Sequence, residues 1–208
     1  MFMEKVNKRT IQAQKTKKLI FDQATRLIKE KGFYNVSIED ITSAVGVSVG
    51  TFYYYFQNKD DLVLLWADDL DQQYSDYYKK ETSRKKRKNV LEILEGILDL
   101  SMAIYSGMGA EFATVSYSYI MRNSEANERF TGSFRVYRQI IRNLINEGRE
   151  KGLIRDDMSV ESMVQNFYKA TRGGIMDWCV NGSNKNIKEF TRDFLRCFLD
   201  GIKPQKQQ

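Results

Sequence analysis

The sequence predicts an all-α protein, and three observations favour this class. The only proline of the 208 residues, Pro204, lies near the end of the sequence, so no helix interior is forced to break. No alternating strand pattern of five or more residues is found. Apolar residues recur instead at spacings of three and four, which places them on one face of a helix. The first such series is Ile20, Ala24, Leu27 and Ile28.

Nine helices are expected, with readable starts and ends. Ser37 before "IED" and Asn58 before "KDD" have the acidic residue three positions later that is typical of a capping box. Gly32 and Gly46 stand where a left-handed residue ends a helix. The predicted helices cover residues 10–31, 37–44, 48–55, 59–81, 88–106, 109–122, 125–151, 160–180 and 187–202.

Composition excludes several functional classes. Lys and Arg number 33 against 27 Asp and Glu, a net charge of +6, which raises the expectation of a polyanionic partner only slightly. The absence of histidine excludes His-containing metal sites and a Ser-His-Asp triad. Cys179 and Cys197 form no CxxC pair and are expected to be reduced thiols. We therefore expect no cofactor and no metal.

The chain is expected to be soluble and cytoplasmic, with no membrane partner. No apolar run approaches the roughly 18 residues of a membrane span. The opening "MFMEKVNKR" carries charges where a signal peptide needs a hydrophobic stretch.

Residues 37–56 are typical of a helix-turn-helix, whose second helix enters the DNA major groove. Two short amphipathic helices are joined by the Gly-containing turn "VGV". The pattern is only moderately specific, because helix pairs in bundles look similar. Their apolar faces are Ile38, Ile41 and Val45 on the first helix, and Val49, Phe52 and Phe56 on the second.

Three consecutive tyrosines sharpen this interpretation. At about 100° per residue, Phe52 and Phe56 lie only about 40° apart, so Tyr54 must project from the opposite side. Tyr53 and Tyr55 lie at the boundary between the two faces. At least one phenol therefore points away from the core. The alternative, that these tyrosines pack on a neighbouring helix, stays open for Tyr53 in particular.

Polar residues beside the tyrosines suit contact with a nucleic acid. Gly50 removes side-chain bulk, and Thr51 offers a hydroxyl and a methyl to the groove. Lys59 opposes the helix dipole in the first turn of its helix, which makes sense if that end faces a phosphate. Ser37 and Ser48 begin helices, so they act as caps, phosphate donors or both.

Residues 16–62, "TKKLIFDQATRLIKEKGFYNVSIEDITSAVGVSVGTFYYYFQNKDDL", resemble the DNA-binding region of the TetR family of bacterial transcriptional regulators. The motifs are dense over about a quarter of the chain. The resemblance implies an all-α homodimer with an N-terminal three-helix head and a C-terminal ligand-binding and dimerisation domain. By position it places Thr51 and Tyr53–Tyr55 on the recognition helix, Lys59 on the phosphate-contacting lysine, and Ser37 at the start of the supporting helix.

We accordingly expect a DNA-binding domain over residues 1–58 and a ligand-binding and dimerisation domain over residues 59–208. Residues 1–18 are a basic arm that either contacts DNA or is a solvated tail. The basic run at residues 79–88 is expected to be a solvated linker rather than a DNA contact.

Residues 160–202 form two amphipathic helices that suit a four-helix dimer interface, although the same pattern fits intrachain core. The pair Gly173-Gly174 permits close approach of another helix. The expected interface residues are Phe167, Thr171, Gly174, Ile175, Trp178, Phe190, Phe194 and Phe198.

The helices between head and interface are rich in aromatic residues and methionine, which suits an apolar cavity with a few phenols. A flat or aromatic ligand would fit it, although each residue taken singly is more often core. The expected cavity residues are Tyr105, Met108, Phe112, Tyr117, Met121, Phe134 and Tyr137.

These features predict a homodimeric repressor that binds a pseudo-palindromic operator in double-stranded DNA and leaves it when a small, largely apolar or aromatic effector binds. The sequence does not encode the effector, the operator, or the choice between repression and activation. Two alternatives are an enzyme built on the same cavity and a helical adaptor. The first lacks histidine and a nucleotide-binding loop, and the second does not explain Thr51, Tyr54 and Lys59.

Overall fold

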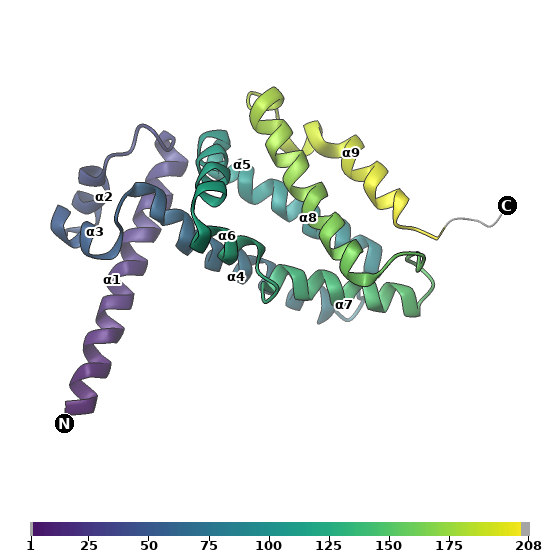
Figure 1. Cartoon of the computed structure of the whole chain (residues 1–208), viewed down its shortest axis with the longest axis horizontal. Coiled ribbons are helices and arrows are strands. Elements are labelled where there is room, and N and C mark those ends of the chain that lie inside the picture. Colours follow the sequence, from purple (N-terminus) through teal and green to yellow (C-terminus); the bar gives the residue numbers. More distant parts are fainter. Residues whose placement is uncertain (1, 205–208) are drawn as a thin grey trace. The chain divides into compact units, whose positions relative to one another are not determined.

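The computed structural model describes residues 2–204, with side chains from residue 10 onward. All regular structure over this range is helical, which confirms the predicted all-α class (Figure 1). The chain forms two compact units, Met1–Trp66 and Ala67–Gln208.

The first unit is a three-helix head. It contains α1 (Phe2–Lys31), α2 (Ile38–Val45), α3 (Val49–Tyr55), the short 3-10 helix η1 (Lys59–Asp61) and the first residues of α4 (Leu62–Thr82). Helix α2 packs against both α1 and α3. The backbone of the predicted basic arm continues α1 back to Phe2, whereas the side chains of Lys5, Lys8 and Arg9 lie outside the described residues.

Local signals explain where α2 begins and ends. Ser37 and Asp40 form the expected capping box: the Asp40 amide donates to Ser37 Oγ at 3.0 Å, and the Ser37 amide donates to Asp40 Oδ2 at 2.8 Å. The Ser37 hydroxyl also donates to Asp40 Oδ2 at 2.6 Å, and this bond and that of the Ser37 amide hold the pKa of the Asp40 carboxyl below its usual value. Gly46 ends the helix at φ 78°, a left-handed conformation that glycine adopts without strain.

Of the faces that periodicity assigned to the core, Ile41, Phe52 and Phe56 are buried, and the other three residues are half-buried. Ile41 of α2 and Phe52 of α3 are both 0% exposed, and Ile20 of α1 is equally buried. Thr42 is 2% exposed, and its hydroxyl donates to the Glu39 carbonyl at 3.2 Å, so this polar side chain is accommodated inside the head. The head therefore has a continuous apolar core.

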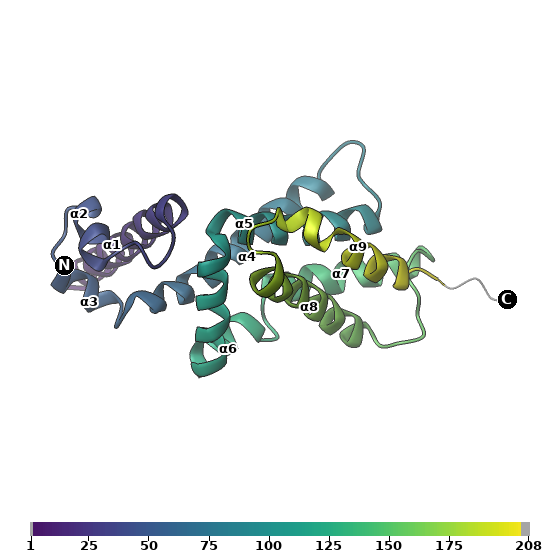
Figure 2. The same cartoon turned by 90° about the horizontal axis from the view of Figure 1, so that it is seen from above.

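The second unit is a helical bundle built around α5 (Val90–Arg122). Helix α5 packs against α6 (Ser124–Thr131), α7 (Val136–Glu150), α8 (Val160–Asp177) and α9 (Ile187–Gly201). Helix α8 packs against both α7 and α9 and lies between them in the view of Figure 1; Figure 2 shows the same helices from above. A short π-helix, Trp178–Gly182, follows α8 directly.

Helix α5 is broken at Gly109, which has φ 83° and ψ 159°. The sequence predicted two helices, 88–106 and 109–122, and the break falls where they meet. A straight helix rises about 1.5 Å per residue, so Tyr105 and Tyr117 would be about 18 Å apart along it. Their rings stack instead, with centroids 6.0 Å apart. The glycine break therefore lets Tyr105 of the first half of α5 reach Tyr117 of the second half.

One predicted helix is wrong as a single element. Residues 125–151 form two helices, α6 and α7, because the chain turns at Gly132, where ψ is 151°. A side chain at this glycine would meet the Glu128 carbonyl oxygen at 2.6 Å. The break thus requires glycine through close packing rather than through a positive φ.

The division between the units falls inside α4, eight residues after the predicted boundary at residues 58 and 59. Leu62, Val63 and Trp66 at the start of α4 are buried at 0–1% exposure. These apolar residues belong to the first unit, so its core extends past η1. The capping box predicted at Asn58 is present, with Asp61 as its acidic partner.

Candidate DNA-binding helix and effector cavity

Helix α3 presents two tyrosines to solvent. Tyr54 is 78% exposed and Tyr53 is 53% exposed, whereas Phe52 on the opposite face is 0% exposed. Tyr55 is half-buried, and its ring meets that of Tyr54 edge-to-face at 4.9 Å. The predicted outward direction of Tyr54 is therefore present, and Tyr53 lies on the exposed side as well.

The hydroxyl groups at the helix starts act as caps. Ser48 Oγ accepts from the Thr51 amide at 3.1 Å and lies 2.9 Å from Thr51 Oγ1. Ser37 caps α2 in the same way, and both serines remain exposed. Gly50 is also exposed. The first turn of α3 is therefore a small, smooth polar surface.

Lys59 joins the start of η1 to the loop between α1 and α2. Its Nζ donates to the Phe33 and Val36 carbonyl oxygens, both at 2.7 Å, and lies 4.2 Å from the centre of the Phe33 ring. The sequence predicted a phosphate contact for this ammonium. In the structure the ammonium also fastens the loop that leads into α2.

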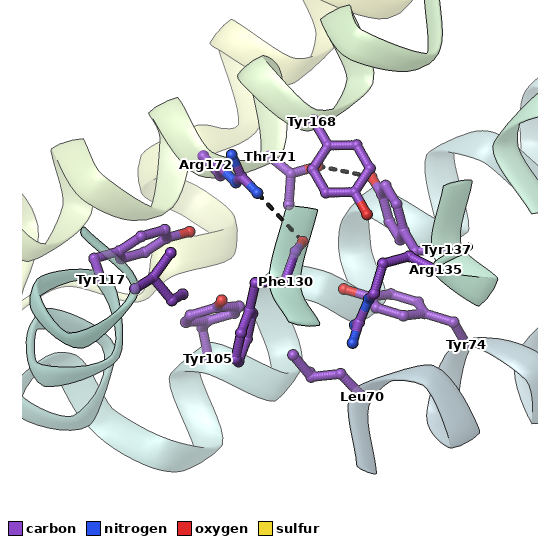
Figure 3. Close-up of a pocket in the computed structure, with 11 residues that line it drawn as sticks. Leu70, Tyr74, Tyr105, Tyr117, Phe130, Arg135, Tyr137, Tyr168, Thr171 and Arg172 are labelled. Carbon is purple, nitrogen blue, oxygen red and sulfur yellow. Dashed lines mark hydrogen bonds between the residues drawn. The ribbon is translucent and has the colours of Figure 1, made fainter. Parts of the chain in front are cut away.

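A small aromatic cavity lies among α4, α5, α6, α7 and α8 in the second unit (Figure 3). Its volume is about 50 Å³, which is room for a few water molecules rather than for an organic ligand of ordinary size. Its lining residues are Leu70, Tyr74, Tyr105, Tyr117, Ile120, Phe130, Arg135, Tyr137, Tyr168, Thr171 and Arg172.

The phenols of the cavity are neutral hydrogen-bond donors. Tyr74 is 2.8 Å from Ser101 Oγ, which itself donates to a backbone carbonyl, so the phenol is the donor. By the same reasoning Tyr137 donates to Thr171 Oγ1 at 2.9 Å. Burial raises the pKa of Tyr74, Tyr105, Tyr117 and Tyr137. The cavity thus disfavours negative charge on its own tyrosines.

Arg135 links the cavity to α4. Its guanidinium donates to the Ala67 carbonyl at 2.8 Å and pairs with Asp71 at 3.1 Å, and the side chain is only 9% exposed. Burial raises the pKa of Asp71, while the charge of Arg135 opposes that rise. The carboxylate and the carbonyl compensate the charge of the buried guanidinium, which offsets part of the cost of taking it out of water.

Residues 20–65 match the family profile described as "Bacterial regulatory proteins, tetR family". This segment is a TetR-family DNA-binding region. The matched segment runs from α1 into α4 and contains both helices of the helix-turn-helix. A chain that carries this region is a DNA-binding regulator of transcription and not an enzyme.

Some relatives match most of the chain, beyond the segment of the family profile, but at low sequence identity. The fatty acid metabolism regulator protein of Bacillus subtilis (strain 168) is 21% identical over 183 residues, covering 88% of this chain and 93% of the relative. The HTH-type transcriptional repressor KstR2 of Rhodococcus jostii (strain RHA1) is 24% identical over 188 residues, covering 88% and 89%. The crystal structure of FadR from Bacillus subtilis with stearoyl-CoA has a TM-score of 0.68 at 21% identity, over 88% of this chain and 98% of that one. This likeness supports the TetR-family fold.

The structure brings three of the seven predicted cavity residues together, namely Tyr105, Tyr117 and Tyr137. Met108 and Phe112 are buried but do not line the cavity. The prediction is wrong for Met121 and Phe134, which are 73% and 87% exposed. Phe134 lies in the turn before α7, so helical periodicity does not apply to it.

Sequence reasoning missed the polar part of the cavity. Arg135 lies just before α7 and Arg172 lies in α8, and both line the cavity. A basic residue close to several tyrosines in the sequence was the signal that could have identified them. Thr171 was assigned to the dimer interface, and Tyr168 was assigned to no site. Tyr74 and Leu70 come from α4, a helix to which the sequence assigned no cavity residue.

The predicted dimer contacts are wrong for the residues of α8 and its π-helical extension. Phe167, Thr171, Gly174, Ile175 and Trp178 are buried in the core of their own chain, because α5, α7 and α9 cover that face. These side chains therefore cannot contact a partner.

The three phenylalanines of α9 behave differently from one another. Phe198 packs edge-to-face on Phe167 at 4.8 Å, and the Phe190 ring covers Gly182. Phe194 is 48% exposed and is the large apolar residue of the predicted set that faces solvent. Gly174 permits α9 to approach α8 within the chain, whereas Gly173 faces open space.

Over residues 2–204, no helix combines the length and apolar character needed to cross a membrane. Among the described side chains there is also no group of three or more acidic or cysteine residues arranged to hold a metal ion.

Proposed function

We propose that this protein is a homodimeric repressor that binds a pseudo-palindromic operator and is released by a small, largely apolar or aromatic effector. The observation that carries the proposal is the exposure of Tyr54 on a helix whose opposite face is the core of a helix-turn-helix. A phenol held outward on a recognition helix is available to base edges and phosphates.

The proposed DNA-contacting residues belong to both helices of the motif. Tyr53 and Tyr54 reach the groove, while Gly50 and Thr51 keep the start of α3 small enough for close approach. The helix starts capped by Ser37 and Ser48 face the phosphates. The remaining proposed contacts are Tyr55 and Lys59.

The proposed dimer surface is an apolar stripe on the exposed sides of α8, the π-helix and α9. It consists of Gly173, Met176, Val180 and Phe194. Met176 is 44% exposed and Val180 is 78% exposed, and a group of exposed apolar side chains marks an interaction surface better than single ones do. A twofold axis across this stripe forms a four-helix interface and presents two heads to one duplex.

The effector is proposed to occupy the aromatic cavity and to act through α4. Arg135 lines the cavity and holds Ala67 and Asp71 of α4, so a ligand that displaces this side chain pulls on that helix. Helix α4 contributes residues to both units, which gives a route from the cavity to the head. A coupling of about 1–3 kcal/mol is sufficient for such a response.

Known relatives support an apolar effector. The FadR structure from Bacillus subtilis contains stearoyl-CoA, and that from Thermus thermophilus contains lauroyl-CoA. Both ligands carry an acyl chain, and we propose that the effector of this protein likewise has an apolar body.

A gel shift and footprint with the DNA that flanks its own gene test the proposal. We expect two protected half-sites about one helical turn, roughly 34 Å, apart, and a marked preference over an unrelated duplex of equal length. Equal affinity for the two duplexes would contradict the proposal and favour a helical adaptor whose head binds protein.

A further inference from the structure

The cavity contains one guanidinium without a carboxylate. Arg172 lines it from α8 and is half-buried (Figure 3). Its Nη2 donates to the Phe130 carbonyl at 3.4 Å, at the long limit of a hydrogen bond, and its guanidinium carbon lies 5.0 Å from the centre of the Tyr168 ring. Within residues 10–204, no carboxylate comes within ion-pair distance of it.

The neighbouring arginines differ from Arg172 in this respect. Arg135 pairs with Asp71 at 3.1 Å, and Arg138 pairs with Glu161. Arg138 also lies against the Tyr168 ring, and its guanidinium carbon is 5.2 Å from the centre of that ring. The charge of Arg135 is therefore compensated inside the protein, and the cavity retains one positive charge from Arg172.

The walls around this charge are neutral and aromatic. Tyr105 and Tyr117 are stacked on one side, and the phenols have raised pKa values, so none of them supplies a compensating anion. A half-buried guanidinium beside aromatic walls gains most from a planar anion that accepts two parallel hydrogen bonds. A single uncompensated charge matches a monoanion better than a phosphate dianion.

We propose that the effector is a monocarboxylate with an apolar aliphatic or aromatic body, and that Arg172 binds its carboxylate. This inference rests on the proposed function only in taking the cavity as the effector site. The apolar body would displace the rings of Tyr105, Tyr117 and Phe130, because the present volume of about 50 Å³ cannot hold it.

Matched acid and amide probes test the proposal directly. The series is hexanoate, octanoate, decanoate, benzoate and cinnamate, each compared with its primary amide by thermal shift and then by calorimetry. We expect at least one acid to bind about ten-fold or more tightly than its amide, since an ion pair to a partly buried charge has roughly that value. If no acid in the series exceeds its amide, the proposal is overturned.

Variants assign the preference to one side chain. Arg172→Met keeps much of the side-chain stem, and we expect it to remove the preference of the protein for the acid. Arg172→Lys should restore part of that preference. Arg138→Met is the matched control, because Arg138 contacts the same Tyr168 ring but does not line the cavity. A preference for the acid that survives in Arg172→Met would overturn the proposal. It would also be overturned if decanoyl-CoA bound more tightly than decanoate and bound the natural protein and Arg172→Met equally well.

The two proposals can fail separately. No DNA enters the binding measurement, so a protein that prefers amides is still a candidate repressor in the gel shift. Conversely, a protein without operator preference can still discriminate acids from amides. If Arg172→Met does not fold, as judged by circular dichroism, the comparison of acid with amide in the natural protein decides the question.

Discussion

Tyr54 shows how a seven-residue helix divides its side chains between core and partner. Phe52 and Phe56, two positions before and after it, are buried, and the helix geometry then leaves the phenol no place inside the head. This orientation follows from periodicity alone, so it was predictable without any tertiary information.

Replacing Tyr54 with alanine is expected to weaken operator binding about ten-fold or more, because a base or phosphate contact at a groove has a value of roughly 1–3 kcal/mol. The measurement is a gel-shift titration, with sedimentation to verify that the dimer remains. Tyr34→Ala is the matched control, since Tyr34 is a tyrosine of the same head that is 66% exposed and lies outside α3. Equal affinities for the two variants would remove Tyr54 from the interface.

Lys59→Met is expected to destabilise the protein and to weaken DNA binding together. The variant leaves the Phe33 and Val36 carbonyls without their donor, which has a cost of about 1–3 kcal/mol in the free energy of unfolding. Denaturant titration measures this loss. The slope of binding against salt should also fall by about one unit if the ammonium contacts a phosphate. An unchanged slope with lowered stability would assign Lys59 to the loop alone.

The role of Lys59 inside the head was not predictable from sequence. Its carbonyl partners lie more than twenty positions earlier in the chain, and backbone oxygens carry no residue-type signal. The pairing of Arg135 with Asp71 was hidden for the same reason, because it joins two helices that are far apart in sequence.

At the scale of the element, the break in α5 depends on a single glycine, Gly109, which the helical pattern alone does not identify. Gly109 has φ 83°, and a methyl group there would meet no atom within 4 Å. The cost of Gly109→Ala is therefore backbone strain alone, about 1–3 kcal/mol in the free energy of unfolding. The same change should disturb the stacking of Tyr105 on Tyr117.

Gly107→Ala provides the opposite expectation two residues away. This glycine also faces open space, but no positive φ requires it, so alanine should stabilise α5 by about 0.4–1 kcal/mol. Chemical denaturation of both variants compares them directly. Effects of the same sign would show that the break at Gly109 is not a structural requirement.

The remaining elements show what periodicity can and cannot resolve. It identified the helices of the head, and it located the break in α5. It did not separate α6 from α7, because the turn at Gly132 depends on contact with Glu128 rather than on a proline or polar run. It also assigned the apolar face of α8 to a partner, since an apolar stripe looks the same whether its neighbour is another helix of the chain or another chain.

At the scale of the whole molecule, the proposed dimer depends on the stripe of Gly173, Met176, Val180 and Phe194. Phe194→Asp places a charge in this stripe, and we expect it to shift the protein from dimer to monomer in sedimentation velocity. Phe134→Asp is the control, because Phe134 is 87% exposed but lies before α7, outside the stripe. Monomers of both variants, or dimers of both, would exclude the stripe as the interface.

The small volume of the cavity has a kinetic consequence. Because about 50 Å³ cannot accept an acyl or aromatic body, ring rearrangement has to precede or accompany entry. If the rings open first, the observed rate in a stopped-flow mixing experiment should level off at high effector concentration, at the rate of that opening. A rate that rises linearly to the highest concentration would mean that ring rearrangement is too fast to limit binding. Where the rate levels off, the regulator responds to a sudden supply of effector with a delay set by its own aromatic side chains.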